Sequence, residues 1–123
     1  MRVKVVSGIF GFEKITEFTL ERIDDFFSVL SAGDISFTLI DPLKLRDYQF
    51  EIPAFYKKLL KYDKKENIKV YCIVVLQNPI EESMINFLAP VVVNEDKNLL
   101  VQIALDEHKY SDYDIADKIK RYL

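Results

Sequence analysis

Few side chains in this sequence are of the types that perform catalysis or bind metals. Its 123 residues include one histidine, His108, and one cysteine, Cys72. A catalytic histidine needs an orienting group and a nucleophile, and the sequence supplies neither in a recognisable pattern. Cys72 lies in the most apolar segment of the chain, where a thiol keeps its proton and is a poor nucleophile. The sequence therefore predicts no enzyme, no cofactor and no metal site.

Adjacent acidic residues are the other candidates for chemistry. They occur at Asp24–Asp25, Glu81–Glu82, Glu95–Asp96 and Asp106–Glu107. Two carboxyl groups can cleave a glycosidic bond when they face each other across it, but neighbouring residues of an extended chain point to opposite sides. A hydrolase built from these residues is an alternative that would need a pocket with convergent carboxyl groups of shifted pKa.

The net charge of -3 is unevenly distributed along the chain. Residues 57–65 carry five lysines and one aspartate, whereas residues 78–117 carry nine carboxylates and two lysines. An acidic surface attracts basic proteins and repels the phosphates of nucleic acids. The lysine-rich segment has the opposite preference, and Tyr56 and Tyr62 are possible stacking groups within it. A direct RNA-binding module that uses the basic helix 54–65 is therefore an alternative interpretation.

Residues 2–6, 16–21, 35–40 and 99–105 have apolar residues on one face, as half-buried strands do. Residues 68–76 and 87–93 are apolar at nearly every position, and 68–76 is expected to be a central strand covered on both faces. Residues 26–30 are ambiguous between a short helix and a strand, and their composition favours a strand. Pro90 cannot donate a hydrogen bond to a neighbouring strand, so it must lie at a sheet edge or a bulge. Asp41 and Pro42 end one strand, and Pro53 begins a helix. Seven strands are expected, at residues 2–6, 16–21, 26–30, 35–40, 68–76, 87–93 and 99–105.

Two helices complete the predicted fold. The first lies in the middle of the chain and buries a stripe formed by Phe55, Leu59 and Tyr62. The second lies at the C-terminus, where Ser111 and Asp114 resemble a capping box. Its apolar stripe consists of Ile115, Ile119 and Tyr122.

We therefore predict a mainly β fold: a small antiparallel β-barrel-like domain with a short mid-chain helix and a C-terminal helix. Residues 1–123 are expected to form a single domain. The chain is 50% hydrophobic and 30% charged, and no apolar run reaches the roughly 18 residues that a membrane span requires. This composition favours a cytoplasmic protein with no membrane partner.

One segment is more specific than these patterns. Asn86–Asn94 reads Asn-Phe-Leu-Ala-Pro-Val-Val-Val-Asn. It resembles the Asn-Leu-x-Ala-Pro motif, followed by aliphatic residues and asparagine, of the FliW family of flagellar assembly factors. Phe87 stands where leucine is commoner. Three weaker elements occur in the same order as in the family: Gly11-Phe12-Glu13, Asp41-Pro42 with the later Asp47-Tyr48, and Val101-Gln102. Together with the motif, they extend the resemblance over about residues 9–113.

The resemblance implies a function in binding. Members of this family are small cytoplasmic factors with a β-barrel-like fold and two alternative partners. One partner is flagellin, the filament subunit, and the other is CsrA, a small RNA-binding dimer that represses flagellin translation. On this hypothesis the chain antagonises CsrA until accumulating flagellin captures it. No direct contact with nucleic acid is implied.

The acidic residues and the motif residues are expected to have different roles. We expect the basic surface of CsrA to be held by Glu81, Glu82, Glu95 and Asp96. The motif residues are expected to be structural, with Asn86 and Asn94 satisfying backbone groups at the ends of the motif strand. The other motif residues in this group are Gly11, Asp41, Pro42, Ala89, Pro90 and Gln102.

Overall fold

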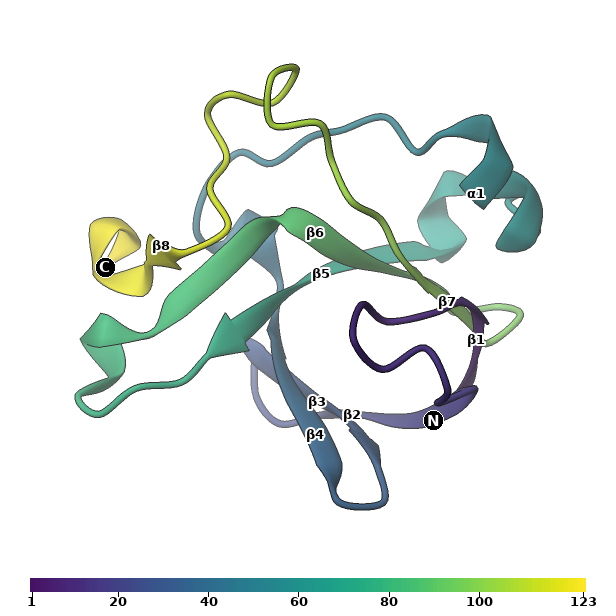
Figure 1. Ribbon diagram of the computed structural model, residues 1–123, viewed down its shortest axis with the longest axis horizontal. Coiled ribbons are helices and arrows are strands. Elements are labelled where there is room, and N and C mark those ends of the chain that lie inside the picture. The colour runs from purple at the N-terminus through teal and green to yellow at the C-terminus, as the bar shows by residue number, and fades with distance from the viewer.

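Eight strands form one sheet that closes on itself in the computed structural model, which describes residues 1–123 (Figure 1). The strands are β1 (Arg2–Ser7), β2 (Glu17–Arg22), β3 (Phe27–Ala32), β4 (Ile35–Ile40), β5 (Ile68–Val75), β6 (Met84–Asn94), β7 (Leu99–Gln102) and β8 (Asp117–Lys118). Their order in the sheet is β5-β4-β3-β2-β1-β7-β6-β8, and β5 also pairs with β6. The first seven strands therefore form a closed barrel, which confirms the predicted fold class.

One strand pair departs from the antiparallel arrangement. β1 runs parallel to β7, while every other pair in the sheet is antiparallel. A ring of seven strands that alternate in direction must contain one parallel pair, because seven is odd. The parallel pair lies where the N-terminal strand meets the last strand of the barrel, so no connection has to cross between them.

Alternating side chains fill the barrel, as the sequence pattern predicts. The largest cluster of buried residues lies inside the barrel and contains Val3, Ile9, Phe18, Leu20, Leu30, Leu39, Tyr71, Val91, Val93 and Leu100. A second cluster surrounds Phe87 on the side of the C-terminal segment. A third lies between β7 and the helix α1 (Ala54–Leu59). Burial on both sides of β6 explains why this strand is almost continuously apolar.

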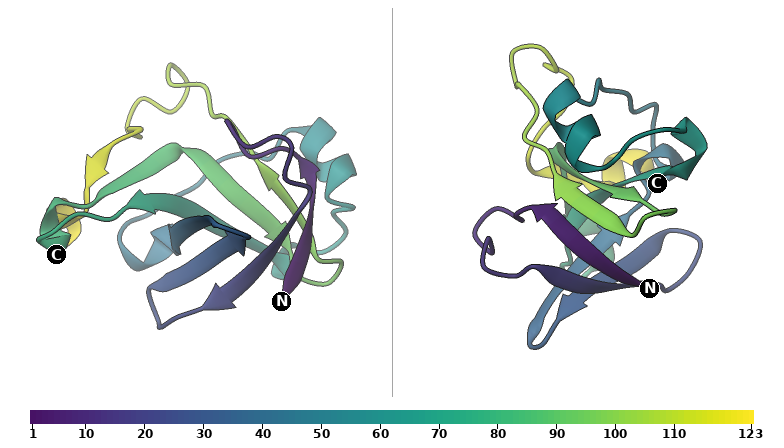
Figure 2. Two further views of the ribbon diagram at one scale, coloured as in Figure 1. Left: turned by 60° about the horizontal axis from the view of Figure 1, so that its bottom comes forward. Right: turned by 90° about the vertical axis from the view of Figure 1, so that its right-hand side faces the viewer.

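Pro90 lies in a bulge of β6, which is one of the two positions expected from its missing N–H. Tyr71 of β5 pairs with Val91, but Ile73 pairs with Asn86. Residues 87–90 therefore stand opposite Cys72 alone. Beyond the bulge, β5 and β6 continue as a hairpin that extends past the barrel, and β8 pairs with the outer edge of β6 there (Figure 2). We call residues 74–85 the hairpin arm.

The mid-chain helix is present but shorter than expected, and one predicted core residue is exposed. α1 has six residues and follows Pro53 directly. Phe55 is 65% exposed, so its predicted burial is wrong. Tyr56 and Leu60 face the barrel instead, because residues four apart lie on one side of a helix. Lys61 then ends the helix with a φ of 53°.

The predicted C-terminal helix is wrong. The segment 111–116 forms turns, Asp117–Lys118 pairs with Met84–Ile85 as β8, and residues 119–122 form one 3-10 turn. The free edge of β6 offers backbone hydrogen bonds that a helix could not use. The carboxylate of Asp117 is buried and accepts hydrogen bonds from the hydroxyl of Tyr122 and from Arg121, at 2.7 Å for the latter. These bonds stabilise the tight 3-10 turn rather than a longer helix.

Candidate interaction surfaces

Gln102 joins three segments behind the bulge. Its Oε1 accepts a hydrogen bond from the backbone N–H of Phe10 at 2.9 Å, and its Nε2 donates to the carbonyl of Ala89 at 3.1 Å. The carbonyl of Pro90 accepts from Ile103 at 3.0 Å. The residues of the bulge therefore do not pair with β5, and their carbonyl groups accept hydrogen bonds from Gln102 of β7 and from the residues after it. Gln102 is 4% exposed and has no atom free for a partner protein.

The two motif asparagines bind backbone groups. Asn94 is fully buried, and its Nδ2 donates to the carbonyl of Leu60 at 2.8 Å. Its Oδ1 accepts from the N–H groups of Asp96 and Lys97 at 3.1 and 3.2 Å. Asn86 Oδ1 accepts from the N–H two residues along, at 3.0 Å. Asn94 therefore fastens the end of α1 to the turn between β6 and β7.

Replacing Asn94 with alanine is expected to lower the free energy of unfolding by about 1–3 kcal/mol, because the Leu60 carbonyl would be buried without a donor. Urea unfolding monitored by circular dichroism measures this loss. Asn86→Ala is the matched variant, and it should cost less because Asn86 makes a single, partly exposed bond. Equal losses for the two variants would contradict the role given to Asn94.

The other motif residues shape turns. Gly11 has a φ of 84°, a value that side chains disfavour, and its N–H donates to Glu13 at 3.0 Å. This bond holds the pKa of the Glu13 carboxyl below its usual value. Asp41 accepts from the N–H of Leu43 at 3.0 Å and caps the turn that begins at Pro42.

The four acidic residues proposed from the sequence do not form one site. Glu81 and Glu82 lie at the tip of the hairpin arm, before β6, whereas Glu95 and Asp96 lie in the turn after it. We call them the arm pair and the turn pair. β6 has eleven residues, so the two pairs are separated by roughly 30 Å at the usual strand rise. Figure 1 shows these two ends of β6 on opposite sides of the molecule.

Lysines already neutralise half of these carboxylates. Lys118 and Lys120 donate to Glu82 at 2.7 and 3.1 Å and hold the pKa of its carboxyl below the usual value. Asp96 pairs with Lys97 at 3.2 Å. Glu81 and Glu95 make no ion pair. The structure therefore leaves one free carboxylate in each pair.

Glu95, the free carboxylate of the turn pair, lines a depression of about 490 Å³. Asp41, with its 3.1 Å ion pair to Lys69, and Tyr71 line the same depression. Burial, followed by the nearby charges of Glu95 and Asp41, raises the pKa of Tyr71 to about 12. The Tyr71 hydroxyl therefore stays protonated and can donate a hydrogen bond to a group that enters the depression.

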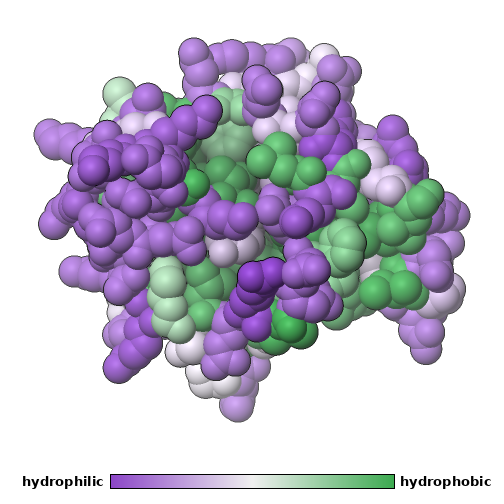
Figure 3. Space-filling view, turned by 180° about the vertical axis from the view of Figure 1, so that it is seen from behind, coloured by the Kyte–Doolittle hydropathy of each residue, from purple (hydrophilic) through white to green (hydrophobic).

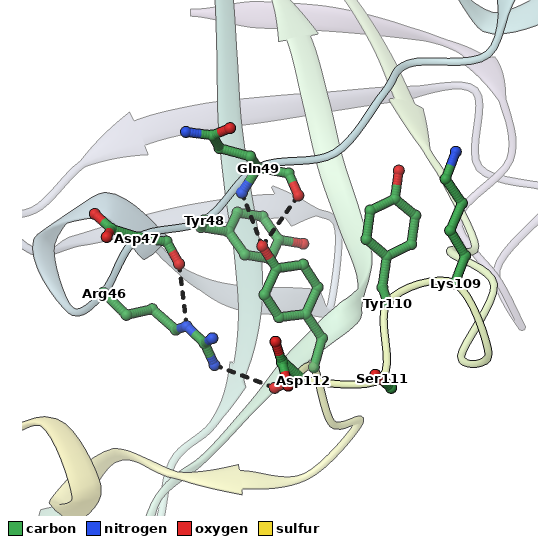
Figure 4. A pocket seen from close by; sticks show the side chains of 9 residues that line it. Arg46, Asp47, Tyr48, Gln49, Lys109, Tyr110, Ser111 and Asp112 are labelled. Atoms are coloured by element: carbon green, nitrogen blue, oxygen red, sulfur yellow. Dashed lines mark hydrogen bonds between the residues drawn. The ribbon is translucent and has the colours of Figure 1, made fainter.

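A second depression, of about 310 Å³, lies between residues 46–49 and 109–113 (Figure 4). Tyr113 joins the two sides of this depression: its hydroxyl accepts a hydrogen bond from the N–H of Gln49 at 2.8 Å and donates one to the Gln49 carbonyl at 3.0 Å. Arg46 packs over the Tyr113 ring, 4.9 Å from its centre, and donates to the Asp112 carbonyl at 3.3 Å. These bonds tie the loop 103–116 to the segment that follows β4.

The residues first considered for catalysis are not assembled into a reactive site. Burial raises the pKa of the Cys72 thiol to about 12. His108 is exposed in the loop after β7. No group of three or more histidine, cysteine or acidic side chains is placed to hold a metal ion. None of the helices has the length and apolar composition that crossing a membrane would require.

The basic segment 57–65 lies on the surface. All five of its lysines are exposed and none makes an ion pair, while Asp63 contacts Lys97 at 3.6 Å. Tyr56 packs against the barrel, and Tyr62 is half-buried with Lys57 over its ring. The exposed aromatic residue is Phe55, which the sequence pattern assigned to the core.

The apolar runs 68–76 and 87–93 leave room for an exposed apolar patch, and the structure exposes such side chains on the hairpin arm, at the end of the first run. Val75 is 55% exposed, Leu76 52% and Ile80 47%. Seen from behind, apolar side chains gather toward the right of the molecule, where the arm lies (Figure 3). The sequence signal was the apolar run 68–76, which continues past the point where β4 and β5 stop pairing at Val74. Exposed clusters of this kind are typical of protein interfaces.

Comparison with known proteins places this arrangement in a family. The model of the FliW protein family matches residues 2–118. The chain is 43% identical to flagellar assembly factor FliW 1 of Wolinella succinogenes, with 100% of the chain and 98% of that protein covered, and 43% identical to flagellar assembly factor FliW of Sulfurimonas denitrificans, with the same coverage. The FliW of Campylobacter lari is 42% identical, with 100% and 97% covered.

A solved structure shares the fold. It is a crystal structure of the flagellar assembly factor FliW, with a TM-score of 0.86 and 23% sequence identity over 96% of this chain and 84% of that one. At this identity the similarity concerns the barrel and its connections. The match to the family model and the full-length relatives carry the assignment: the chain belongs to the FliW family of flagellar assembly factors.

Proposed function

We propose that this protein acts in the cytoplasm by binding two alternative partners, flagellin and the RNA-binding regulator CsrA, and that it catalyses no reaction. While it holds CsrA, repression of flagellin synthesis is relieved. When free flagellin accumulates, flagellin captures the protein and releases CsrA. The exchange requires that each partner weakens the binding of the other, because the surfaces assigned to them below lie on opposite sides of the molecule. Under that coupling, the partner with the larger ratio of free concentration to dissociation constant occupies more of the shared protein.

The observation that carries the proposal is the uncovered apolar surface of the hairpin arm in a member of a flagellar assembly family. Val75, Leu76 and Ile80 would each gain from being covered, at roughly 25 cal/mol for each Å² of apolar surface removed from water. The proposal requires that flagellin, before it is assembled, exposes apolar surface that can cover the hairpin arm. A chaperone-like contact between two such surfaces keeps both out of water.

The turn pair supports the contact with CsrA. The free carboxylate of Glu95 lies beside a depression into which a basic side chain can reach, close to Asp41 and the Tyr71 hydroxyl. The arm pair lies far from it, and Glu82 is already bound by two lysines. We therefore assign direct contact with the basic partner to Glu95 and Asp96, and a steering role at longer range to Glu81 and Glu82.

Direct binding of RNA is the second candidate function. The five unpaired lysines of the basic segment and the exposed ring of Phe55 favour it. Two observations weigh against it: the tyrosines of this segment pack on the protein, and the chain as a whole is acidic. RNA retained on the protein at low salt and released as salt is raised would favour this candidate.

Titration calorimetry with purified partners tests the proposal. CsrA and monomeric flagellin should each bind the full chain, and flagellin added to the complex with CsrA should displace CsrA. In a reconstituted translation reaction, the protein should restore flagellin synthesis that CsrA represses. Binding of neither partner would overturn the proposal, and simultaneous binding of both would overturn its switch.

A further inference from the structure

Two neighbouring strands of the barrel separate and leave unpaired edges. β4 and β5 pair at Ile40–Cys72, Leu39–Ile73 and Thr38–Val74, and their pairing ends there. Residues 35–37 of β4 continue with β3 as their sole partner, and Val75 of β5 continues with β6 alone. Figures 1 and 2 show the β3–β4 hairpin and the hairpin arm pointing in different directions from this place. We call the two edges the open edge pair.

Only their short length protects these edges. Exposed strand edges usually carry lysine, proline or a bulge, because bare backbone groups recruit other strands. The open edge pair has none of these: β4 contributes Ile-Ser-Phe at residues 35–37, and β5 ends with Val75, which Leu76 follows. Val75 and Leu76 are each more than half exposed. An uncharged, apolar edge favours the addition of another strand.

We propose that an extended segment of flagellin binds here as an added strand, with its backbone paired to the open edge pair and its apolar side chains covering Val75 and Leu76. This inference rests on the proposed function and specifies where and how that partner binds. Backbone hydrogen bonds supply the affinity in strand addition, and alternate side chains supply the specificity.

Charge at the two outer ends limits which segments fit. Asp34 lies in the turn before β4, and Glu81 lies at the tip of the hairpin arm, and neither makes an ion pair. An acidic segment would be repelled at both ends. The open edge pair therefore selects an extended, apolar segment flanked by neutral or basic residues. A compact basic surface such as that of CsrA gains little from an apolar edge.

Two matched leucine variants of the full chain test the inference. Leu76→Lys places a charge on the edge, whereas Leu43→Lys places one on the turn after β4, at a side chain that is 67% exposed. Calorimetry with monomeric flagellin should give about tenfold weaker binding for Leu76→Lys and unchanged binding for Leu43→Lys, which corresponds to about 1.4 kcal/mol for the first variant. Both variants should keep the unfolding midpoint of the unmodified protein, since both side chains are exposed.

Hydrogen exchange gives the readout that is specific to strand addition. Adding flagellin should slow exchange at those amides of residues 35–37 and 75–76 that face away from β3 and β6, whereas adding CsrA should leave them unchanged. Flagellin binding without this protection, or with equal affinity for both leucine variants, would overturn the inference and leave the proposed function intact. Protection of these amides by CsrA would assign the edges to CsrA and would also overturn the inference. Failure of flagellin to bind the unmodified protein would overturn the flagellin part of the proposed function, and this inference with it.

Discussion

Phe87→Ala is expected to lower the free energy of unfolding by about 3–5 kcal/mol, which is a large share of the total stability of a domain of this size. Phe87 is fully buried, and its ring lies 5.6 Å from that of Tyr48 and 5.9 Å from that of Tyr122. The guanidinium of Arg46 lies over the same ring at 5.4 Å. Removing the ring leaves a cavity under the bulge of β6 that these neighbours cannot fill without breaking their own contacts.

Two further variants make this prediction specific. Phe87→Leu restores the commoner residue of the family motif and should recover more than half of the loss, because it refills most of the cavity. Phe55→Ala removes the same ring from an exposed position and should change stability by less than about 0.5 kcal/mol. Urea unfolding of the three variants provides the comparison. A loss below about 1 kcal/mol for Phe87→Ala would show that the bulge is not anchored by this ring.

The strands could be predicted from the sequence because each has its own signal. Alternation of side chains marks the strands that have one face in the barrel, and a continuous apolar run marks β6. Pro90 predicts a sheet edge or a bulge through its missing N–H, and the structure has the bulge. The four-residue length of that bulge has no such local signal, because it is set by Gln102 and Ile103, which bind the Ala89 and Pro90 carbonyls.

The C-terminal segment shows how tertiary contacts override a local pattern. Residues 111–122 have helical spacing of apolar residues, yet Ile115 is 68% exposed and Asp117 is buried. Pairing with the edge of β6 and the bonds from Arg121 and Tyr122 to the Asp117 carboxylate favour an extended segment and a tight turn. The strand pairing depends on residues distant in sequence. The hydrogen bonds depend on Asp117, which the helical pattern places on the solvent-exposed face.

The interaction surfaces were only partly predictable for a similar reason. The sequence identifies the acidic residues, but not that Lys118 and Lys120 reach Glu82 from the other end of the chain. The predicted strand 87–93 lies between the two acidic pairs and already indicates their separation, which the expectation of one shared site did not take into account. The structural role of Asn94 was predictable in part, because it bonds to the turn that directly follows, whereas its bond to the Leu60 carbonyl joins residues distant in sequence.

The double variant Glu95→Lys, Asp96→Lys is expected to weaken CsrA binding by about 10- to 100-fold at low salt, because it reverses the turn pair where we assign direct contact. The matched variant Glu81→Lys, Glu82→Lys makes the same change of charge at the arm pair. It should slow association by only a few-fold and leave dissociation unchanged, since charges outside a contact act mainly through steering.

Association and dissociation rates at two salt concentrations separate these roles. The turn-pair variant should dissociate faster at both concentrations, whereas the effect of the arm-pair variant should fade as salt shortens the range of electrostatic attraction. Flagellin binding is the control for folding, and the turn-pair variant should retain it because Glu95 and Asp96 lie across the molecule from the hairpin arm. Faster dissociation from the arm-pair variant, with none from the turn-pair variant, would place CsrA at the hairpin arm and make the two partners compete for one surface.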